Sequence, residues 1–440
     1  MTSTSDTHSD ATSASVAESA HCGCPDEPRG ALSRRTVLGA LGAAGAATLL
    51  DLTPGHRYAF AAGGAPVGDT LVCLFLRGGM DGLSVVPPIG DSGYAARRPT
   101  IAVPPSQAIK LDRMFALHPR MAPLKTVWDR LDLAIIAATG DADGTRSHFD
   151  AEDAMERGVK GGDSVYTGWI DRHFTSRSEG QPPFPSVAIG GRLPTSLRGP
   201  AQDIVIRSAS DFGLNVGEAV EPRTKRALHD LHSGFASPVA TQGKETLRAI
   251  DLLRARRGKA YTPANGATYP ATEFGRALQE VAQLIKAKVG LEAACLDLPG
   301  WDMHQGIGTP DQGLMAAQLD DFAGGLAAFY TDLGPLMART TVVTMSEFGR
   351  TVAENGSNGT DHGYGSNMFL MGGGIRGGRV YGRWPTLAKD KLDKQGDLMV
   401  TTDYRDVLAE IVRVRMRNGR LGDVFPGHRA RPIGFTEQYR

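Results

Sequence analysis

Short aliphatic runs bounded by turn residues recur along this chain and limit its fold more than any other feature. Runs this short and this continuously apolar are typical of strands that are buried on both faces of a mostly parallel sheet. Five such runs are present: residues 70–76, 133–138, 187–190, 291–298 and 340–345. The sequence therefore predicts a sheet with at least these strands at its centre.

Amphipathic segments separate the apolar runs. Residues 121–131, 272–290 and 315–333 place aliphatic side chains at helical spacing. A further pattern at 401–417 predicts a packing helix with Thr402 or Asp403 as its N-cap. Strands and helices in alternation predict a three-layer α/β fold, with a mostly parallel sheet and helices on both of its faces.

The two ends of the chain differ in composition. Residues 1–30 are polar, and the stretch "SRRTVLGALGAAGAATLL" follows them. Arg34 and Arg35 before a mildly hydrophobic run, then the small residues "AFAA", resemble a twin-arginine export signal that is cleaved after Ala61. We therefore expect a leader and signal at 1–61 and one α/β domain at 62–440, in which the irregular stretch 191–270 is an insertion or cap.

The charge balance limits the class of partner, and the positions of the cysteines indicate whether they form disulfides. The 440 residues contain 48 basic and 48 acidic side chains. A formal net charge of zero argues against a nucleic-acid-binding protein, which needs a basic surface. Cys22 and Cys24 lie in the leader, whereas Cys73 and Cys295 lie in predicted strands, where we expect two buried free thiols.

Polar side chains follow four of the predicted strands directly. In an open α/β sheet, ligands bind beyond the carboxyl ends of the strands, so these side chains are candidates for one shared site. In chain order the candidates are Asp81, Ser147, His148, Asp302, His304, Glu347, Arg350, Asp361 and His362. Independent turn residues would be expected at both ends of the sheet.

Each candidate also has a structural interpretation. Asp81 between glycines could form an Asx turn, and Ser147 with Asp150 could form a helix capping box. His304 could be a loop histidine, and Asp361 could bond its own backbone. Glu347 and Arg350 could form an ion pair. The glycines at 370–378 precede no helix, so a tight turn near the site is favoured over a nucleotide-binding loop.

The set combines carboxylates with imidazoles and has no thiolate. Such ligands favour Zn²⁺, Mn²⁺ or Fe over Mg²⁺ or Ca²⁺, with one or two ions bound. Ser147 is the hydroxyl best placed to act as a nucleophile, and Arg350 could hold the non-bridging oxygens of a phosphate or sulfate ester.

Five motifs in order carry a resemblance to a known family. They are "FLRGGMDGLS", "RSHFDAE", "GWDMH", "SEFGRT" and "GTDHG", and "GGGIRGGRVYGRWP" follows them. Together they resemble the DUF1501 family, which is related to the alkaline phosphatase and sulfatase superfamily. The resemblance implies an alkaline phosphatase-like fold, Asp81 as the metal ligand after the first strand, and Ser147 at the nucleophile position.

The resemblance also implies ligands for two ions. Asp302 and His304 would bind one ion, Glu347 would bind the other, and His362 would be the late histidine. Phe348 departs from the superfamily pattern, because an apolar ring stands where an imidazole ligand is often found.

The leading hypothesis is an exported metal-dependent hydrolase of a small anionic ester. We expect it to pass through the twin-arginine machinery to a periplasmic, cell-wall-associated or secreted location, with no membrane anchor after cleavage. The alternative is a non-catalytic exported protein that keeps the fold for binding or assembly of a surface partner. A redox enzyme with an organic cofactor is a third possibility, but no dinucleotide fingerprint supports it.

Overall fold

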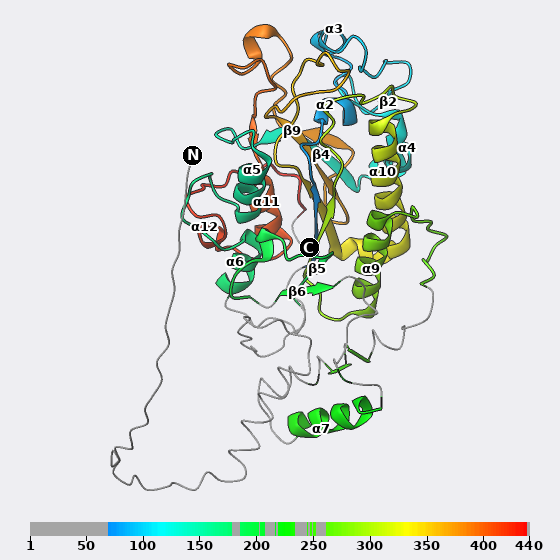
Figure 1. Cartoon of the computed structure of the whole chain (residues 1–440), viewed down its shortest axis with the longest axis vertical. Helices are drawn as coiled ribbons and strands as arrows, with labels where there is room; N and C mark the ends of the chain where they lie inside the picture. Colours follow the sequence, from blue (N-terminus) through cyan, green and yellow to red (C-terminus); the bar gives the residue numbers. More distant parts are fainter. Residues whose placement is uncertain are drawn as a thin grey trace, which may run out of the picture. The chain divides into compact units, whose positions relative to one another are not determined.

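A nine-stranded sheet forms the centre of the fold in the computed structural model (Figure 1). The structure describes residues 69–177, 185–201, 203–206, 219–233 and 261–437, together with the isolated positions 216, 244, 247–248 and 250–251. The leader and signal therefore lie outside the described residues. So does much of the 191–270 stretch, whose described parts include strand β6 (Asp203–Ile206) and helix α7 (Glu221–Ser233).

All five predicted strands are confirmed. They are β1 (Thr70–Leu76), β4 (Leu133–Gly140), β5 (Ser186–Ile189), β7 (Ala293–Leu298) and β8 (Thr340–Met345). The sheet order is β10-β4-β9-β8-β1-β7-β5-β6, with β11 (Thr402–Asp403) also paired to β4. Strand β10 is Arg379–Tyr381.

One strand of this sheet runs against the others. Strand β9 (Ser366–Met371) is antiparallel to both β4 and β8, whereas all other pairs in the sheet are parallel. The mostly parallel sheet is thus confirmed. Because β9 is reversed, the loop before it lies at the edge where the parallel strands end.

Helices cover both faces of the sheet, as the alternating pattern predicts. One face packs against α4 (Ala122–Asp129), α9 (Glu273–Ala287) and α10 (Leu314–Leu333). The other packs against α5 (His148–Arg157), α6 (Trp169–Ser176), α11 (Tyr404–Val414) and α12 (Leu421–Val424). Figure 1 shows the two helical layers on either side of the strands.

Strand β1 shows why the apolar runs are continuous. Val72, Leu74 and Leu76 belong to one core, whereas Leu71 and Cys73 belong to the other. Successive side chains of a strand point to opposite faces, so a strand that is covered on both faces needs apolar residues at every position.

Three smaller expectations are also settled. Cys73 and Cys295 are buried free cysteines on neighbouring strands. Asp403 is the N-cap of α11, and its side chain accepts a hydrogen bond from the Arg405 amide. The expectation that the glycines at 370–378 approach the site is wrong. Gly372 and Gly373 pack against Thr340 and Ala338 at the start of β8, the opposite edge of the sheet.

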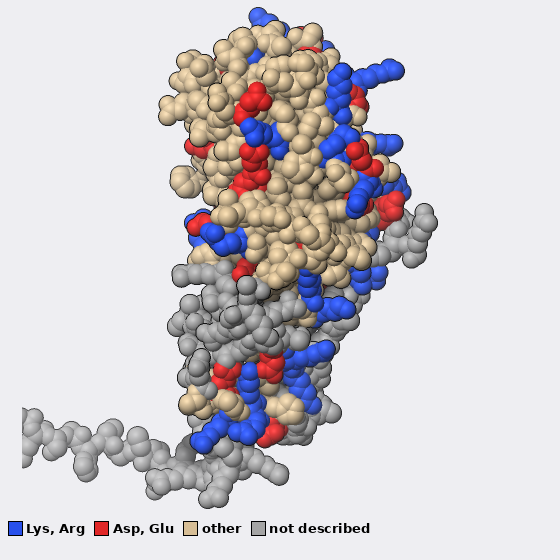
Figure 2. Space-filling view, turned by 90° about the vertical axis from the view of Figure 1, so that its right-hand side faces the viewer, with Lys and Arg blue, Asp and Glu red and all other residues tan. Residues whose placement is uncertain are grey.

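The surface carries both signs of charge side by side. On the face shown in Figure 2, acidic and basic side chains lie next to one another in several separate places, and other residues form most of the described surface. No helix among the described residues is long and apolar enough to cross a membrane.

Candidate functional site

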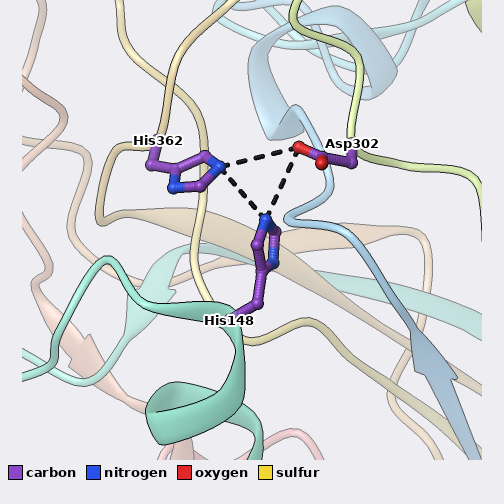
Figure 3. Close-up of side chains that lie close together, drawn as sticks. All are labelled: His148, Asp302 and His362. Atoms are coloured by element: carbon purple, nitrogen blue, oxygen red, sulfur yellow. Dashed lines mark hydrogen bonds and ion pairs between the residues drawn. The ribbon is translucent and has the colours of Figure 1, made fainter. Parts of the chain in front are cut away.

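Three side chains from separate segments meet at the carboxyl edge of the sheet. They are His148 at the first position of α5, Asp302 in the loop after β7, and His362 in the loop before β9 (Figure 3). One nitrogen or oxygen from each lies within 4.8 Å of the others. We call these three residues the metal triad.

The ligand atoms of the metal triad face one another. The Nε2 atoms of His148 and His362 are 3.1 Å apart. The Oδ1 atom of Asp302 is 3.5 Å from Nε2 of His148 and 3.6 Å from Nε2 of His362. Two nitrogens and one carboxylate oxygen thus point toward a common centre.

Both histidines of the triad have their other ring nitrogen bonded to an acceptor. Nδ1 of His148 lies 2.6 Å from Oε1 of Glu347, and Nδ1 of His362 lies 2.9 Å from the carbonyl oxygen of Arg146. A carboxylate and a carbonyl only accept hydrogen bonds, so both Nδ1 atoms carry the proton. When both rings are neutral, each Nε2 presents a lone pair, and two lone pairs 3.1 Å apart repel unless a metal ion or a further proton lies between them.

A third histidine lies beside the triad. Nε2 of His304 is 2.9 Å from Nε2 of His362 and 3.1 Å from Oδ1 of Asp302. Its Nδ1 lies 3.0 Å from Oδ1 of Asp361, an exposed carboxylate. His304 therefore repeats the arrangement of the triad histidines at the solvent-facing side of the site.

This pattern fits a metal site. Histidine ligands in proteins usually donate their second ring nitrogen to a carboxylate or a backbone carbonyl, which fixes the tautomer and the ring orientation. Burial together with the nearby charges of Arg350 and the other two histidines lowers the pKa of His362. A lowered pKa keeps this imidazole neutral, as a metal ligand must be.

Glu347 is placed behind the metal triad. Its side chain is fully buried, and Oε1 accepts hydrogen bonds from His148 and from the Gly78 amide at 2.8 Å. Glu347, which the resemblance implies as a ligand, thus contacts the His148 ring on the side away from Asp302 and His362. Phe348, the departure from the superfamily pattern, packs its ring 4.8 Å from both triad imidazoles.

Arg350 is buried, and its guanidinium is bonded to protein acceptors. It donates to the carbonyl oxygens of Gly78, Gly79, Trp301 and Thr360, and its Nη2 lies 2.5 Å from Oδ1 of Asp302. Burial alone would raise the pKa of Asp302, but the hydrogen bond and charge of Arg350 outweigh it and hold the pKa below its usual range. The observed contacts of Arg350 therefore fix the loops and the charge of Asp302.

Asp81 does not reach the metal triad. Its oxygens lie 2.6 and 2.9 Å from the two terminal nitrogens of Arg98, and the Ser84 hydroxyl donates to it at 2.6 Å. Burial alone would raise the pKa of Asp81, but the charge and hydrogen bonds of Arg98 hold it below its usual range. Both carboxylate oxygens are thus engaged by protein donors.

The glycines before Asp81 allow close approach of three chain segments. Gly78 and Gly79 have φ of 116° and 69°. A Cβ on Gly78 would lie 2.4 Å from the Asp302 amide nitrogen, and one on Gly79 would lie 2.6 Å from the Phe348 ring. Only glycine combines this backbone conformation with this lack of volume.

Ser147 is the N-cap of α5, but its hydroxyl makes no capping hydrogen bond. It directly precedes His148 and is half-buried. From the sequence both residues are candidates, but a role, that of nucleophile, is assigned only to the Ser147 hydroxyl. The signal that could have selected His148 is the recurrence of histidine after three strand ends, since three imidazoles at one edge form a ligand set.

Comparison with known proteins supports the family prediction. The model of a family described as "Protein of unknown function (DUF1501)" matches residues 247–423. The predicted resemblance to DUF1501 is confirmed. The matched part of the chain contains Asp302, His304, Glu347, Arg350 and His362, whereas His148 lies before it. No curated protein matches the sequence.

Several solved structures are similar to the chain at low identity. The C-terminal periplasmic domain of EcEptC from Escherichia coli, in complex with Zn, is 9% identical with a TM-score of 0.35 and covers 73% of this chain and 77% of its own. The PsFucS1 sulfatase from Pseudoalteromonas sp. is 14% identical, with a TM-score of 0.30 and coverages of 71% and 64%. Alkaline phosphatase from the Antarctic bacterium TAB5 is 10% identical, with a TM-score of 0.28 and coverages of 70% and 92%.

Proposed function

We propose that this chain is an exported metal-dependent hydrolase of a phosphate or sulfate ester. The observation that carries the proposal is the convergence of the Nε2 atoms of His148 and His362 with a carboxylate oxygen, each imidazole being held by an acceptor at its other nitrogen. His148, Asp302 and His362 would hold the ion, with His304 beside them.

The ligand set favours particular ions. Imidazole nitrogen suits Zn²⁺, Mn²⁺ and Fe better than it suits Mg²⁺ or Ca²⁺, which prefer oxygen. We propose one ion, because Asp81, the ligand expected after the first strand, is paired with Arg98, and Glu347, expected to bind the second ion, accepts hydrogen bonds from His148 and Gly78. A bound divalent ion would supply Lewis acidity toward the ester oxygens.

Ser147 is the proposed nucleophile. Its hydroxyl would attack the phosphorus or sulfur atom, the alcohol would leave with a proton, and water would then release phosphate or sulfate and restore the hydroxyl. Its place beside His148, at the start of α5 and with no capping bond, supports this role. Arg350 would hold the site together through Asp302 and the glycine loop.

Metal analysis and an ester assay test the proposal. The purified full chain should contain close to one equivalent of Zn, Mn or Fe and should hydrolyse aryl phosphates or sulfates. Ser147→Ala should lose turnover but keep metal, whereas Asp302→Ala should lose both. Asp143→Ala is the matched control for Asp302, because Asp143 is an exposed carboxylate paired with Lys160. Metal-free, inactive wild-type protein would refute the proposal.

The non-catalytic alternative has one observation in its favour. Arg350, the residue expected to hold the ester, is buried and bonded to protein. If the wild type binds metal but hydrolyses no ester, the chain is an exported metal-binding protein that keeps the fold for a partner. The export route is tested by replacing Arg34 and Arg35 with Lys in the full chain and measuring how much protein leaves the cytoplasm.

A further inference from the structure

The residue after the triad histidine is an exposed aromatic. Phe149 follows His148 in the first turn of α5 and is 86% exposed, more than any other large apolar side chain among the described residues. Ser147, the proposed nucleophile, directly precedes His148, so Phe149 lies two positions after it. A largely exposed phenyl ring is therefore the next side chain after the triad histidine.

The charged groups around the triad restrict what else a ligand could meet there. The two carboxylates at the site that face solvent are Asp302 and Asp361, whose side chains are 52% and 60% exposed. Asp150, the next residue of α5, is exposed as well. Additional negative charges on a ligand would lie close to these carboxylates and would be repelled.

The arginines that reach these residues are already engaged. The side chains of Arg350 and Arg98 have no exposed surface and are paired with Asp302 and Asp81. Arg146 forms an ion pair with the buried Asp397 and stacks on Tyr364 with its guanidinium carbon 4.6 Å from the ring centre. None of these three arginines is a ready partner for a second anionic group.

We infer that the site takes esters with one anionic centre and an apolar, preferably aromatic, leaving group, which packs against Phe149. Nucleotides and other polyanions do not fit this environment. The inference rests on the proposed function and narrows its substrate class. The phosphoryl or sulfuryl group would lie at the triad, and the phenyl ring of Phe149 would lose water contact when the leaving group binds.

Binding of non-hydrolysable analogues tests the inference without requiring turnover. The zinc-loaded full chain is titrated by calorimetry with phenylphosphonate and methylphosphonate, and in a second pair with benzenesulfonate and methanesulfonate. The wild type should bind the phenyl member of at least one pair about tenfold more tightly, a difference of about 1.4 kcal/mol. Phe149→Ala should reduce this ratio to about two or less, and Phe149→Leu should keep most of it.

Leu131→Ala is the matched control. Leu131 is 60% exposed and lies just before β4 begins, at the opposite edge of the sheet. It should leave the ratio unchanged. Equal binding of the phenyl and methyl members by the wild type, or an unchanged ratio in Phe149→Ala, would overturn the inference and leave the hydrolase proposal standing. If zinc binds and all four ligands fail to bind, both the inference and the hydrolase proposal are wrong.

Discussion

Asp81 and Asp302 both follow central parallel strands at the same edge of the sheet, yet they have different environments. Asp81 is buried and paired through both oxygens with Arg98. Asp302 is half exposed and gives one oxygen to Arg350 and to the approaching histidines. A carboxylate at a strand end becomes a structural ion pair where a buried guanidinium reaches both oxygens, and stays available to a metal where the pairing is partial.

Removing the charge of Asp81 gives the largest expected effect. Asp81→Asn leaves the Arg98 guanidinium buried without its counter-charge, which should lower the free energy of unfolding by about 3–5 kcal/mol. Urea unfolding measures the loss, and metal content per folded chain should not change. Asp143→Asn, at an exposed pair, should cost less than about 1 kcal/mol. If Asp81→Asn instead releases metal with stability unchanged, Asp81 is a ligand and the comparison fails.

For the metal triad we expect the main effect on metal binding and not on stability. His148→Ala should weaken Zn²⁺ binding by more than about a hundredfold, because a direct ligand contributes more than the residues that orient it. Competition with a chelator measures the dissociation constant. The unfolding free energy of the metal-free protein should fall by less than in Asp81→Asn, because the buried Glu347 loses its His148 partner but still accepts a hydrogen bond from the Gly78 amide. His229→Ala, on the exposed helix α7, is the matched control and should bind Zn²⁺ like the wild type.

Two carboxylates orient histidines at the site, and the buried one should contribute more to Zn²⁺ binding than the exposed one. Glu347 is fully buried behind His148, whereas Asp361 is 60% exposed behind His304. Glu347→Gln should weaken Zn²⁺ binding by roughly 10- to 100-fold. Asp361→Asn should weaken it only by about twofold to threefold, because water can replace an exposed acceptor. Equal losses in the two variants would show that His304 is bound as firmly as the triad histidines.

The fold was predictable because its signals are local. Each of the five predicted strands is a short, mostly apolar run, and the predicted helices keep a helical spacing of aliphatic residues. Strand β9 was missed, although residues 367–371 are mostly apolar, because the glycines that follow drew the interpretation toward a turn. Its reversed direction depends on pairing with β4 and β8, which no local pattern encodes.

The site was predictable as a set of segments but not as a set of roles. Strand ends brought Asp302, His304 and His362 together as expected. Whether the Ser147 hydroxyl or the His148 ring meets the other candidates depends on how α5 begins. The partner of Asp81 is Arg98, 17 residues further along the chain. Contacts of this kind are decided by tertiary packing, so spacing in the sequence could not assign them.

Asp171 extends the comparison to a buried carboxylate without a guanidinium partner. On α6, its Oδ1 accepts a hydrogen bond from the Ala201 amide at 2.6 Å, and its buried Oδ2 has no hydrogen-bond partner among the described residues. Burial raises the pKa of Asp171 to about 6, because the Ala201 bond and the charge of Arg172 offset it only in part. The pKa of Asp81 moves the opposite way because Arg98 neutralises it.

The raised pKa of Asp171 predicts a pH-dependent stability change. The folded chain holds this proton up to about pH 6, whereas the unfolded chain releases it near 3.8. The contribution of Asp171 to stability is therefore full below pH 3.8, falls as the pH rises to about 6, and stays low above that.

Asp171→Asn keeps the acceptor without the charge. Its unfolding free energy should match that of the wild type near pH 4 and exceed it by on the order of 1 kcal/mol at pH 7.5. Urea midpoints at the two pH values measure this difference. If the difference between the two proteins were the same at both pH values, the pKa of Asp171 would not be raised. Asp171 would then be a stabilised carboxylate like Asp81.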